Sequence, residues 1–151
     1  MSHSENYNTM NINQILFGVN ALILFFVATI HFYWVFGGKW GANAVLPQIN
    51  SQKRVFTPSP IATFAVAIPF LLISLIFAQA AGWFNFDIIG QYLSSLLLIL
   101  VAVFAIRALG DFKYVGFFKK IKNTEFAIND TKYFTPICAF VAVSLLIAIY
   151  I

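Results

Sequence analysis

Four long apolar runs dominate this chain and restrict it to folds that a lipid bilayer can accommodate. They cover about residues 12–36, 60–81, 88–109 and 134–151. Each has the roughly 17–25 residues that an α-helix needs to cross the hydrocarbon core. The composition agrees, because 61% of the residues are hydrophobic and only 9% are charged, against about 25% charged in soluble domains. The sequence therefore predicts an all-α integral membrane four-helix bundle, forming one domain over residues 1–151.

The basic residues fall on one side of the membrane that these runs predict. Four crossings place both termini and the second loop on one face, and the first and third loops on the other. All nine basic residues lie in or beside the first and third loops: Lys39, Lys53, Arg54, Arg107, Lys113, Lys119, Lys120, Lys122 and Lys132. Because basic loops are held in the cytoplasm, we predict an N-out/C-out topology. Membrane lipids with anionic headgroups, and not nucleic acid, are the expected counter-charge.

The third loop contains a basic amphipathic segment between the third and fourth runs. From Asp111 to Ile121 it reads DFKYVGFFKKI, with apolar residues at near-helical spacing and lysines between them. Such a segment can lie in the membrane interface, with its apolar side in the acyl boundary and its lysines toward the headgroups. It can equally fold back under the bundle and close its cytoplasmic end. Both alternatives stay open at this point.

Polar residues inside the runs are costly in lipid, so they mark structural or functional positions. Asn20 lies in the outer half of the first run, and the predicted topology places Gln79 and Gln91 in the same half. We interpret Asn20, Gln79 and Gln91 as a structural polar layer, because amides in membrane helices commonly form hydrogen bonds between helices.

A second, ionisable layer is expected near the cytoplasmic end, where His31, Trp34, Arg107 and Asp111 converge. His31 can exchange protons near neutral pH, and Arg107 can anchor an anion or reach lipid phosphates. We predict that Arg107 pairs with Asp111, one helical turn on, with His31 close by. A ligand inside the bundle is expected to contact His31, Trp34, Arg107 and Asp111. No catalytic group, metal cluster or cofactor motif is visible, and Cys138, the one cysteine, has no disulfide partner in the chain.

Local signals predict where helices begin and which helices are neighbours. Ser59-Pro60 and Thr135-Pro136 each join a capping hydroxyl to a proline that fits the first helical position. The second loop, residues 82–87, is so short that the second and third runs are expected to be antiparallel neighbours. The small residues Ala78, Ala80, Ala81 and Gly82 would let another helix approach closely, either in a homo-oligomer or in a larger membrane complex.

Three segments of the chain resemble one bacterial family. They are residues 31–41, HFYWVFGGKWG, residues 107–118, RALGDFKYVGFF, and residues 124–136, TEFAINDTKYFTP, where the family usually has Ser-Pro in place of Thr135-Pro136. The chain is similar over nearly its whole length to the family catalogued as domain of unknown function 3995, which comprises small four-span membrane proteins. The resemblance implies the fold and a location in the bacterial inner membrane, and it implies no activity.

The shared positions cluster on the predicted cytoplasmic face. They are His31, Gly37, Gly38, Trp40, Gly41, Arg107, Gly110, Asp111, Gly116, Asp130 and Pro136. These residues either join the cytoplasmic loops into a cap or line a small polar cavity. The leading function is a binding or accessory protein that holds a lipid, a small ligand or a partner subunit. The alternatives are an intramembrane enzyme, which the lack of a carboxylate pair disfavours, and a small oligomeric transporter.

Overall fold

The computed structural model describes residues 11–50, 53–84 and 93–150, and almost all of its regular structure is helical. The four long helices are α1 (Ile12–Val35), α3 (Pro60–Ala80), α4 (Leu93–Leu109) and α6 (Thr135–Tyr150). Two short helices, α2 (Ala42–Val45) and α5 (Glu125–Asn129), and the π-helical turn η2 (Asp130–Phe134) lie between them. Strands β1 (Gln48–Asn50) and β2 (Lys53–Arg54) form an antiparallel ribbon. The all-α class is confirmed, and the ribbon is a small addition that the sequence did not predict.

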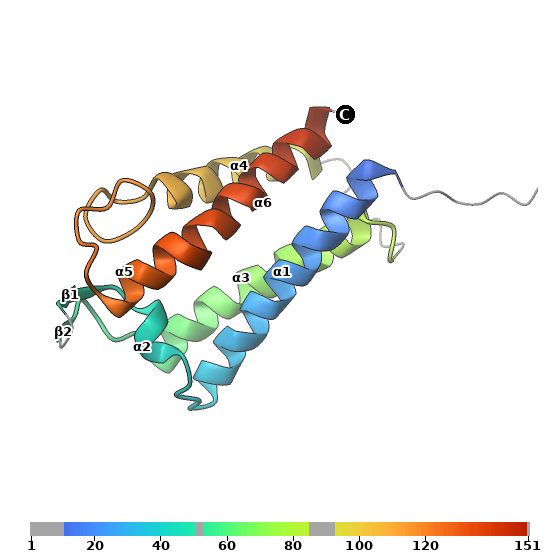
Figure 1. The fold of residues 1–151 in the computed structure, drawn as a ribbon. Coiled ribbons are helices and arrows are strands. Elements are labelled where there is room, and N and C mark those ends of the chain that lie inside the picture. The colour runs from blue at the N-terminus through green and yellow to red at the C-terminus, as the bar shows by residue number, and fades with distance from the viewer. Residues whose placement is uncertain (1–10, 51–52, 85–92, 151) are drawn as a thin grey trace, which may run out of the picture.

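The long helices form two antiparallel pairs, α1 with α3 and α4 with α6, which meet where α1 packs against α6 (Figure 1). The start of α1 and the end of α6 lie together at one end, which we call the terminal end. The ribbon, α2, α5 and the segment after α4 lie at the opposite end, which we call the loop end. The expected packing of the second run against the third is wrong, because α3 packs mainly on α1 and α4 mainly on α6.

The helices have the length and composition of membrane spans. Three of them are long and apolar enough to cross a bilayer: Ile12–Val35, Pro60–Ala80 and the continuous helix Glu125–Tyr150. The fourth, Leu93–Leu109, is equally apolar but has 17 residues. Its predicted start near residue 88 lies outside the described residues. A multi-pass membrane protein follows from these helices.

The start of α3 is the one that the sequence predicts. The Ser59 side chain accepts a hydrogen bond from the Ala62 N–H at 3.2 Å, and Pro60 occupies the first helical position. This hydroxyl satisfies one of the N–H groups that have no partner at a helix start. At the start of α1 the Asn11 side chain accepts from the Gln14 N–H at 2.8 Å, and the Gln14 side chain accepts from the Asn11 N–H at 3.0 Å.

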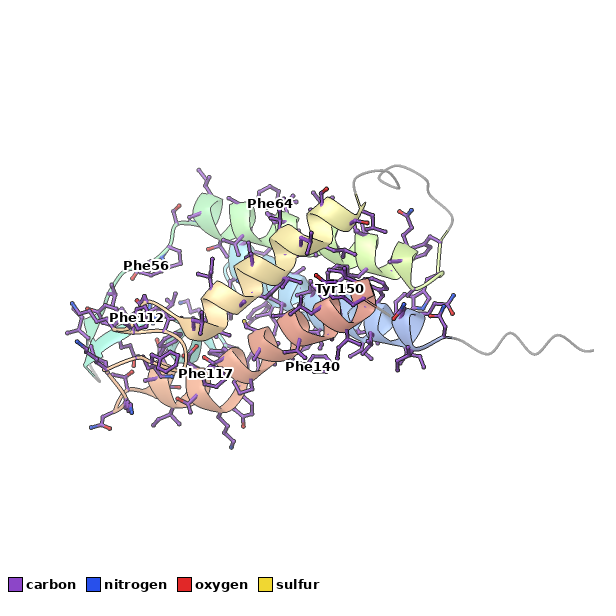
Figure 2. All side chains as sticks on the ribbon, turned by 90° about the horizontal axis from the view of Figure 1, so that it is seen from above. Phe56, Phe64, Phe112, Phe117, Phe140 and Tyr150 are labelled. Atoms are coloured by element: carbon purple, nitrogen blue, oxygen red, sulfur yellow. The ribbon has the colours of Figure 1, made fainter. Side chains whose placement is uncertain are left out.

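The core is small and draws on all four long helices, with Leu24, Phe77, Val141 and Leu145 almost fully buried and Leu97, Leu100 and Phe104 of α4 in the same cluster. Two residues of the small-residue patch, Ala78 and Ala81, are also buried within the chain. Near them Gly18 of α1 faces the Trp83 ring. Much of the patch therefore packs the chain's own helices together. Many large apolar side chains point outward, as Phe64, Phe140 and Tyr150 do in Figure 2, which suits contact with lipid.

Candidate functional site

The chemistry-bearing side chains of the loop end converge on Asp130, at the first position of the π-helical turn. Residues 125–150 run as one helix through this turn. Pro136 has no N–H to give and its ring would crowd the carbonyl one turn earlier. The chain widens just before it, and the Thr135 N–H bonds to the Asp130 carbonyl oxygen, five residues back. The α-helical part α6 begins at Thr135, but the predicted capping role of Thr135 is wrong, because the helix already runs through α5 and the π-helical turn before it.

The Asp130 carboxylate is fully buried and accepts four hydrogen bonds. Its Oδ1 accepts from Arg107 Nη2 at 2.7 Å. Its Oδ2 accepts from Lys119 Nζ at 3.0 Å, from the Gly116 N–H at 2.9 Å and from Thr135 Oγ1 at 3.0 Å. Because the two charged donors and the carboxylate strengthen one another in a low-dielectric site, Asp130 ties α4, the third loop and α6 together. We call this group of residues the Asp130 cluster.

Lys119 is the unexpected member of the cluster, since only 3% of its side chain is exposed. It reaches the interior because the segment between α4 and α5 folds back under the bundle. The Phe117 N–H bonds to the Ala108 carbonyl at 2.9 Å, and Lys119 Nζ also donates to the Gly116 carbonyl at 3.0 Å. The fold-back of this segment is confirmed, and it leaves the outer side of the segment free to contact the membrane interface. The near-helical spacing of residues 111–121 does not produce a helix.

Asp111 shapes this fold-back and does not pair with Arg107. Its Oδ1 accepts hydrogen bonds from the N–H groups of Lys113, Tyr114 and Val115 at 2.6–2.9 Å. Partial burial alone would raise the pKa of the Asp111 carboxyl, but these three backbone N–H groups lower that pKa below its ordinary value. The predicted Arg107–Asp111 pair is thus wrong. The loop turns away from the helix axis immediately after α4, and the carboxyl goes to its own loop.

Two glycines make the fold-back possible. Gly110 and Gly116 have φ angles of 92° and 87°, a region that residues with a Cβ rarely enter. Their backbones touch: a Cβ on Gly116 would lie 2.5 Å from the Gly110 Cα, and a Cβ on Gly110 would overlap the Val115 carbonyl. Among the described residues, Phe112 is the one residue other than glycine that has a positive φ angle, 60°. Such a conformation costs about 1–3 kcal/mol, which the hydrogen bonds to Asp111 offset.

The Asp130 cluster carries an excess of positive charge. Two cations, Arg107 and Lys119, share one carboxylate. Arg107 Nη1 is buried and has no hydrogen-bond partner, although 32% of the whole side chain is exposed. A buried donor without an acceptor costs free energy, and so does a buried positive charge without a counter-charge. An anion at Arg107 would supply both the acceptor and the counter-charge.

His31 and Trp34 lie in a separate group. His31 Nδ1 is 2.7 Å from the Val27 carbonyl oxygen, so Nδ1 carries the proton that this contact needs. The imidazole packs between the Trp34 and Phe70 rings, with centroids 5.1 Å and 5.5 Å away. Trp34 Nε1 donates to the Trp40 carbonyl at 2.8 Å. Within residues 11–50, 53–84 and 93–150, no hydrogen bond or ring contact joins this aromatic group to the Asp130 cluster.

Among the described residues, Asn20 of the predicted structural polar layer forms a buried hydrogen bond between α1 and α6. Asn20 Nδ2 donates to Ser144 Oγ at 2.8 Å, and Ser144 Oγ donates to the Val141 carbonyl at 3.0 Å. Asn20 is fully buried and its Oδ1 has no partner. In the structure Asn20 thus joins α1 to α6 by a side-chain hydrogen bond. Gln79 is half-buried on α3, and Gln91 lies outside the described residues.

Lys119, Thr135 and Ser144 are the site residues that the sequence analysis missed. Lys119 and Lys120 are adjacent in the sequence, and the sequence does not indicate which of the two lysines is buried. Thr135 was assigned as a helix cap. The signal that could have found Lys119 was Asp130, one of the positions shared with the family. A carboxylate so close to an apolar run needs a nearby cation. Among the described residues, no three His, Cys, Asp or Glu side chains lie close enough together to hold a metal ion.

Comparison with known proteins identifies the family of the chain. A family model described as "Protein of unknown function (DUF3995)" matches residues 24–145. This match covers α3 and α4 completely, half of α1, most of α6 and the whole Asp130 cluster, and the chain belongs to this family. No curated protein and no solved structure shows significant similarity to the chain.

Proposed function

We propose that this protein is a binding protein of the bacterial inner membrane, which holds an anionic headgroup at Arg107 on the cytoplasmic side. The orientation rests on charge. The described basic residues gather at the loop end, and none lies at the terminal end. Basic segments are retained in the cytoplasm, so both termini lie outside. A C-terminal alkaline phosphatase fusion is expected to be active and a C-terminal green fluorescent fusion dark. The reverse pattern contradicts the orientation.

One observation carries the binding proposal: the Asp130 cluster has two cations for one carboxylate, and Arg107 Nη1 has no acceptor. A phosphate or carboxylate accepts two parallel hydrogen bonds from a guanidinium. Arg107 keeps Nη2 on Asp130 at 2.7 Å, which fixes the guanidinium while Nη1 binds the anion after a small movement of its surroundings. The exposed part of the side chain lies beside the buried Nη1, so a headgroup reaches this nitrogen only after that movement.

The neighbourhood of Arg107 suits a lipid better than a soluble anion. The residues next to it along α4, Ile106 and Leu109, are exposed and apolar, so acyl chains can lie along the helix while the headgroup reaches the guanidinium. His31 and Trp34 belong to the α1–α3 pair, on the other side of the bundle. They would contact the same lipid only if it extended between the two helix pairs.

Native mass spectrometry of protein purified in mild detergent tests this proposal. The wild type is expected to retain an anionic phospholipid. Arg107→Lys keeps a cation for Asp130 but loses the second nitrogen, so retention is expected to fall about tenfold or more while the melting temperature changes little. Lys39→Ala removes an exposed charge at the loop end, outside both the Asp130 cluster and residues 110–123, and serves as the matched control, with retention unchanged.

Two results would contradict the proposal. One is a wild type that carries no anionic lipid even after incubation with phosphatidylglycerol. The other is equal retention by wild type and Arg107→Lys, which would leave Arg107 as a structural residue of the cap. His31→Ala, examined in parallel, separates the two groups of residues: unchanged retention confines the ligand to the Asp130 cluster.

A further inference from the structure

The segment that folds back under the bundle exposes its phenylalanines and buries a lysine. Between Gly110 and Asn123 the residues Phe112, Phe117 and Phe118 are 59%, 55% and 59% exposed, whereas Lys119 as a whole residue is 4% exposed. Water-facing loops have the opposite arrangement, because apolar surface is driven out of water. We call Phe112, Phe117 and Phe118 the phenylalanine platform. Figure 2 labels Phe112 and Phe117 at the loop end of the molecule.

The platform is held rigidly from inside. The Asp111 carboxylate accepts the N–H groups of residues 113–115, and the Asp130 carboxylate accepts the Gly116 N–H and the Lys119 ammonium. Phe112 is kept at φ 60°, and its ring stacks on Phe118 with centroids 6.1 Å apart. A strained residue that the surrounding structure holds in place is a common feature of binding surfaces. Here the strain presents an aromatic ring outward.

Charge identifies the surface that covers the platform. Lys113, Lys120 and Lys122 surround the phenylalanines and are all exposed. The one carboxylate between Gly110 and Asn123 is Asp111, which is already engaged by backbone N–H groups. Apolar rings among exposed lysines match the boundary of an anionic leaflet, where rings enter the acyl region and ammonium groups meet phosphates.

The position of the loop fits the same surface. It begins directly after the apolar helix α4 ends at Leu109, so it lies at the depth where a span leaves the hydrocarbon. We propose that the phenylalanine platform inserts into the cytoplasmic leaflet at the headgroup–acyl boundary, with Lys113, Lys120 and Lys122 on anionic lipids. This anchoring concerns the surface of the protein and is independent of a headgroup at Arg107.

A depth measurement tests the insertion. A nitroxide is attached at Phe117→Cys in a Cys138→Ala background, and its accessibility to oxygen and to a water-soluble nickel chelate is measured in nanodiscs. The discs contain phosphatidylcholine alone or with phosphatidylglycerol. Labels at Ile99→Cys, exposed on α4, and at Asn123→Cys, exposed in the loop, give the lipid and water references. We expect the label at residue 117 to behave as lipid-immersed, and more so with phosphatidylglycerol.

Two variants separate insertion from folding. Phe112→Gly removes one ring at a backbone angle that glycine adopts freely, so the loop keeps its shape and the label moves toward water. Lys113→Gln with Lys120→Gln is expected to weaken the anionic preference, by about fivefold per lysine if each contributes ~1 kcal/mol near the surface. A label at residue 117 that is as accessible to nickel as the one at residue 123 overturns the proposal. So does one shielded from both reagents, which indicates contact with protein.

Discussion

The two ends of the bundle are joined by different kinds of interaction. At the loop end a fully buried carboxylate, Asp130, accepts two cations, a backbone N–H and a hydroxyl. Toward the terminal end α1 and α6 share one neutral hydrogen bond, from Asn20 to Ser144. The first arrangement draws on three segments of the chain and the second on two. The first also contains charges that lose their partner when one member is removed, whereas the second contains none.

This difference indicates what each end is built to do. A neutral hydrogen bond in an apolar layer aligns two helices, and its loss costs little stability, because single hydrogen bonds between membrane helices are weak. A charge cluster in the same environment is expensive to assemble and fixes one arrangement of the loop above it. The loop end is therefore the end with a single fixed arrangement of its side chains. Both Arg107 and the phenylalanine platform lie there.

The largest expected effect comes from breaking the cluster at its centre. Asp130→Ala leaves Arg107 and Lys119 without their carboxylate, and removing one partner of a buried ion pair costs about 3–5 kcal/mol. We expect a large fall in the melting temperature in detergent and rapid proteolysis between Gly110 and Asn123. Asp130→Ala combined with Lys119→Met removes the buried ammonium as well, and is expected to recover part of the loss. Equal stability of the wild type and Asp130→Ala would contradict the central role of this carboxylate.

A smaller effect is expected from the glycines, which offer a matched pair. Gly110 and Gly37 both have positive φ angles, 92° and 88°. A methyl group on Gly110 would overlap the Val115 carbonyl, whereas one on Gly37 has nothing within 4 Å. Gly37→Ala is therefore expected to cost only the backbone term of about 1–2 kcal/mol. Gly110→Ala adds displacement of the loop and should cost clearly more.

Thermal unfolding in detergent, followed by circular dichroism, measures both glycine variants. Protection of the segment from limited proteolysis provides a second measurement. Gly110→Ala should expose it and Gly37→Ala should not. If the two substitutions were equally costly, the close approach of Gly110 to residues 115 and 116 would contribute nothing to stability.

The apolar pattern was enough to predict the parts of this fold that lipid determines. The start of α1, the Ser59–Pro60 start of α3 and the end of α4 at Leu109 follow from apolar run length and cap residues, which are local signals. The collection of polar groups at the loop end was also foreseeable, since basic residues and glycines concentrate there. A role for Asn20 between helices followed from the cost of an amide in lipid.

The pairing of individual groups could not be predicted, because it depends on how the chain turns after α4. Arg107 was assigned to the nearest carboxylate in sequence, Asp111, yet it pairs with Asp130, 23 residues away. That choice follows from the positive-φ glycines, which direct the loop back, and from the π-helical turn, which rotates Asp130 inward. Neither conformation has a reliable signature in a single sequence. The predicted packing of the second run against the third was also wrong, because a connection between helices α3 and α4 does not by itself make them pack.

The smallest expected effect is at the Asn20–Ser144 hydrogen bond. It tests whether the neutral link between α1 and α6 contributes less stability than the Asp130 cluster. Ser144→Ala removes the acceptor of Asn20 Nδ2, and Asn20→Leu removes the donor and its unpaired Oδ1 together. Hydrogen bonds of this kind average about 0.6 kcal/mol and reach ~1.7 kcal/mol in membrane proteins. Each single variant should lie in that range, and Asn20→Leu should be the milder one, because it also removes an orphaned acceptor.

The double variant decides whether the two side chains act as a pair. If they do, Asn20→Leu with Ser144→Ala costs less than the sum of the two single changes, and the shortfall is the coupling energy. Thermal unfolding of the four proteins in one detergent gives this quantity. A coupling as large as the loss in Asp130→Ala would erase the contrast between the two ends. A coupling of zero would mean that apolar packing around Leu24, Val141 and Leu145 alone joins α1 to α6. The two ends would then differ in that ion pairs hold the loop end and apolar packing holds the other.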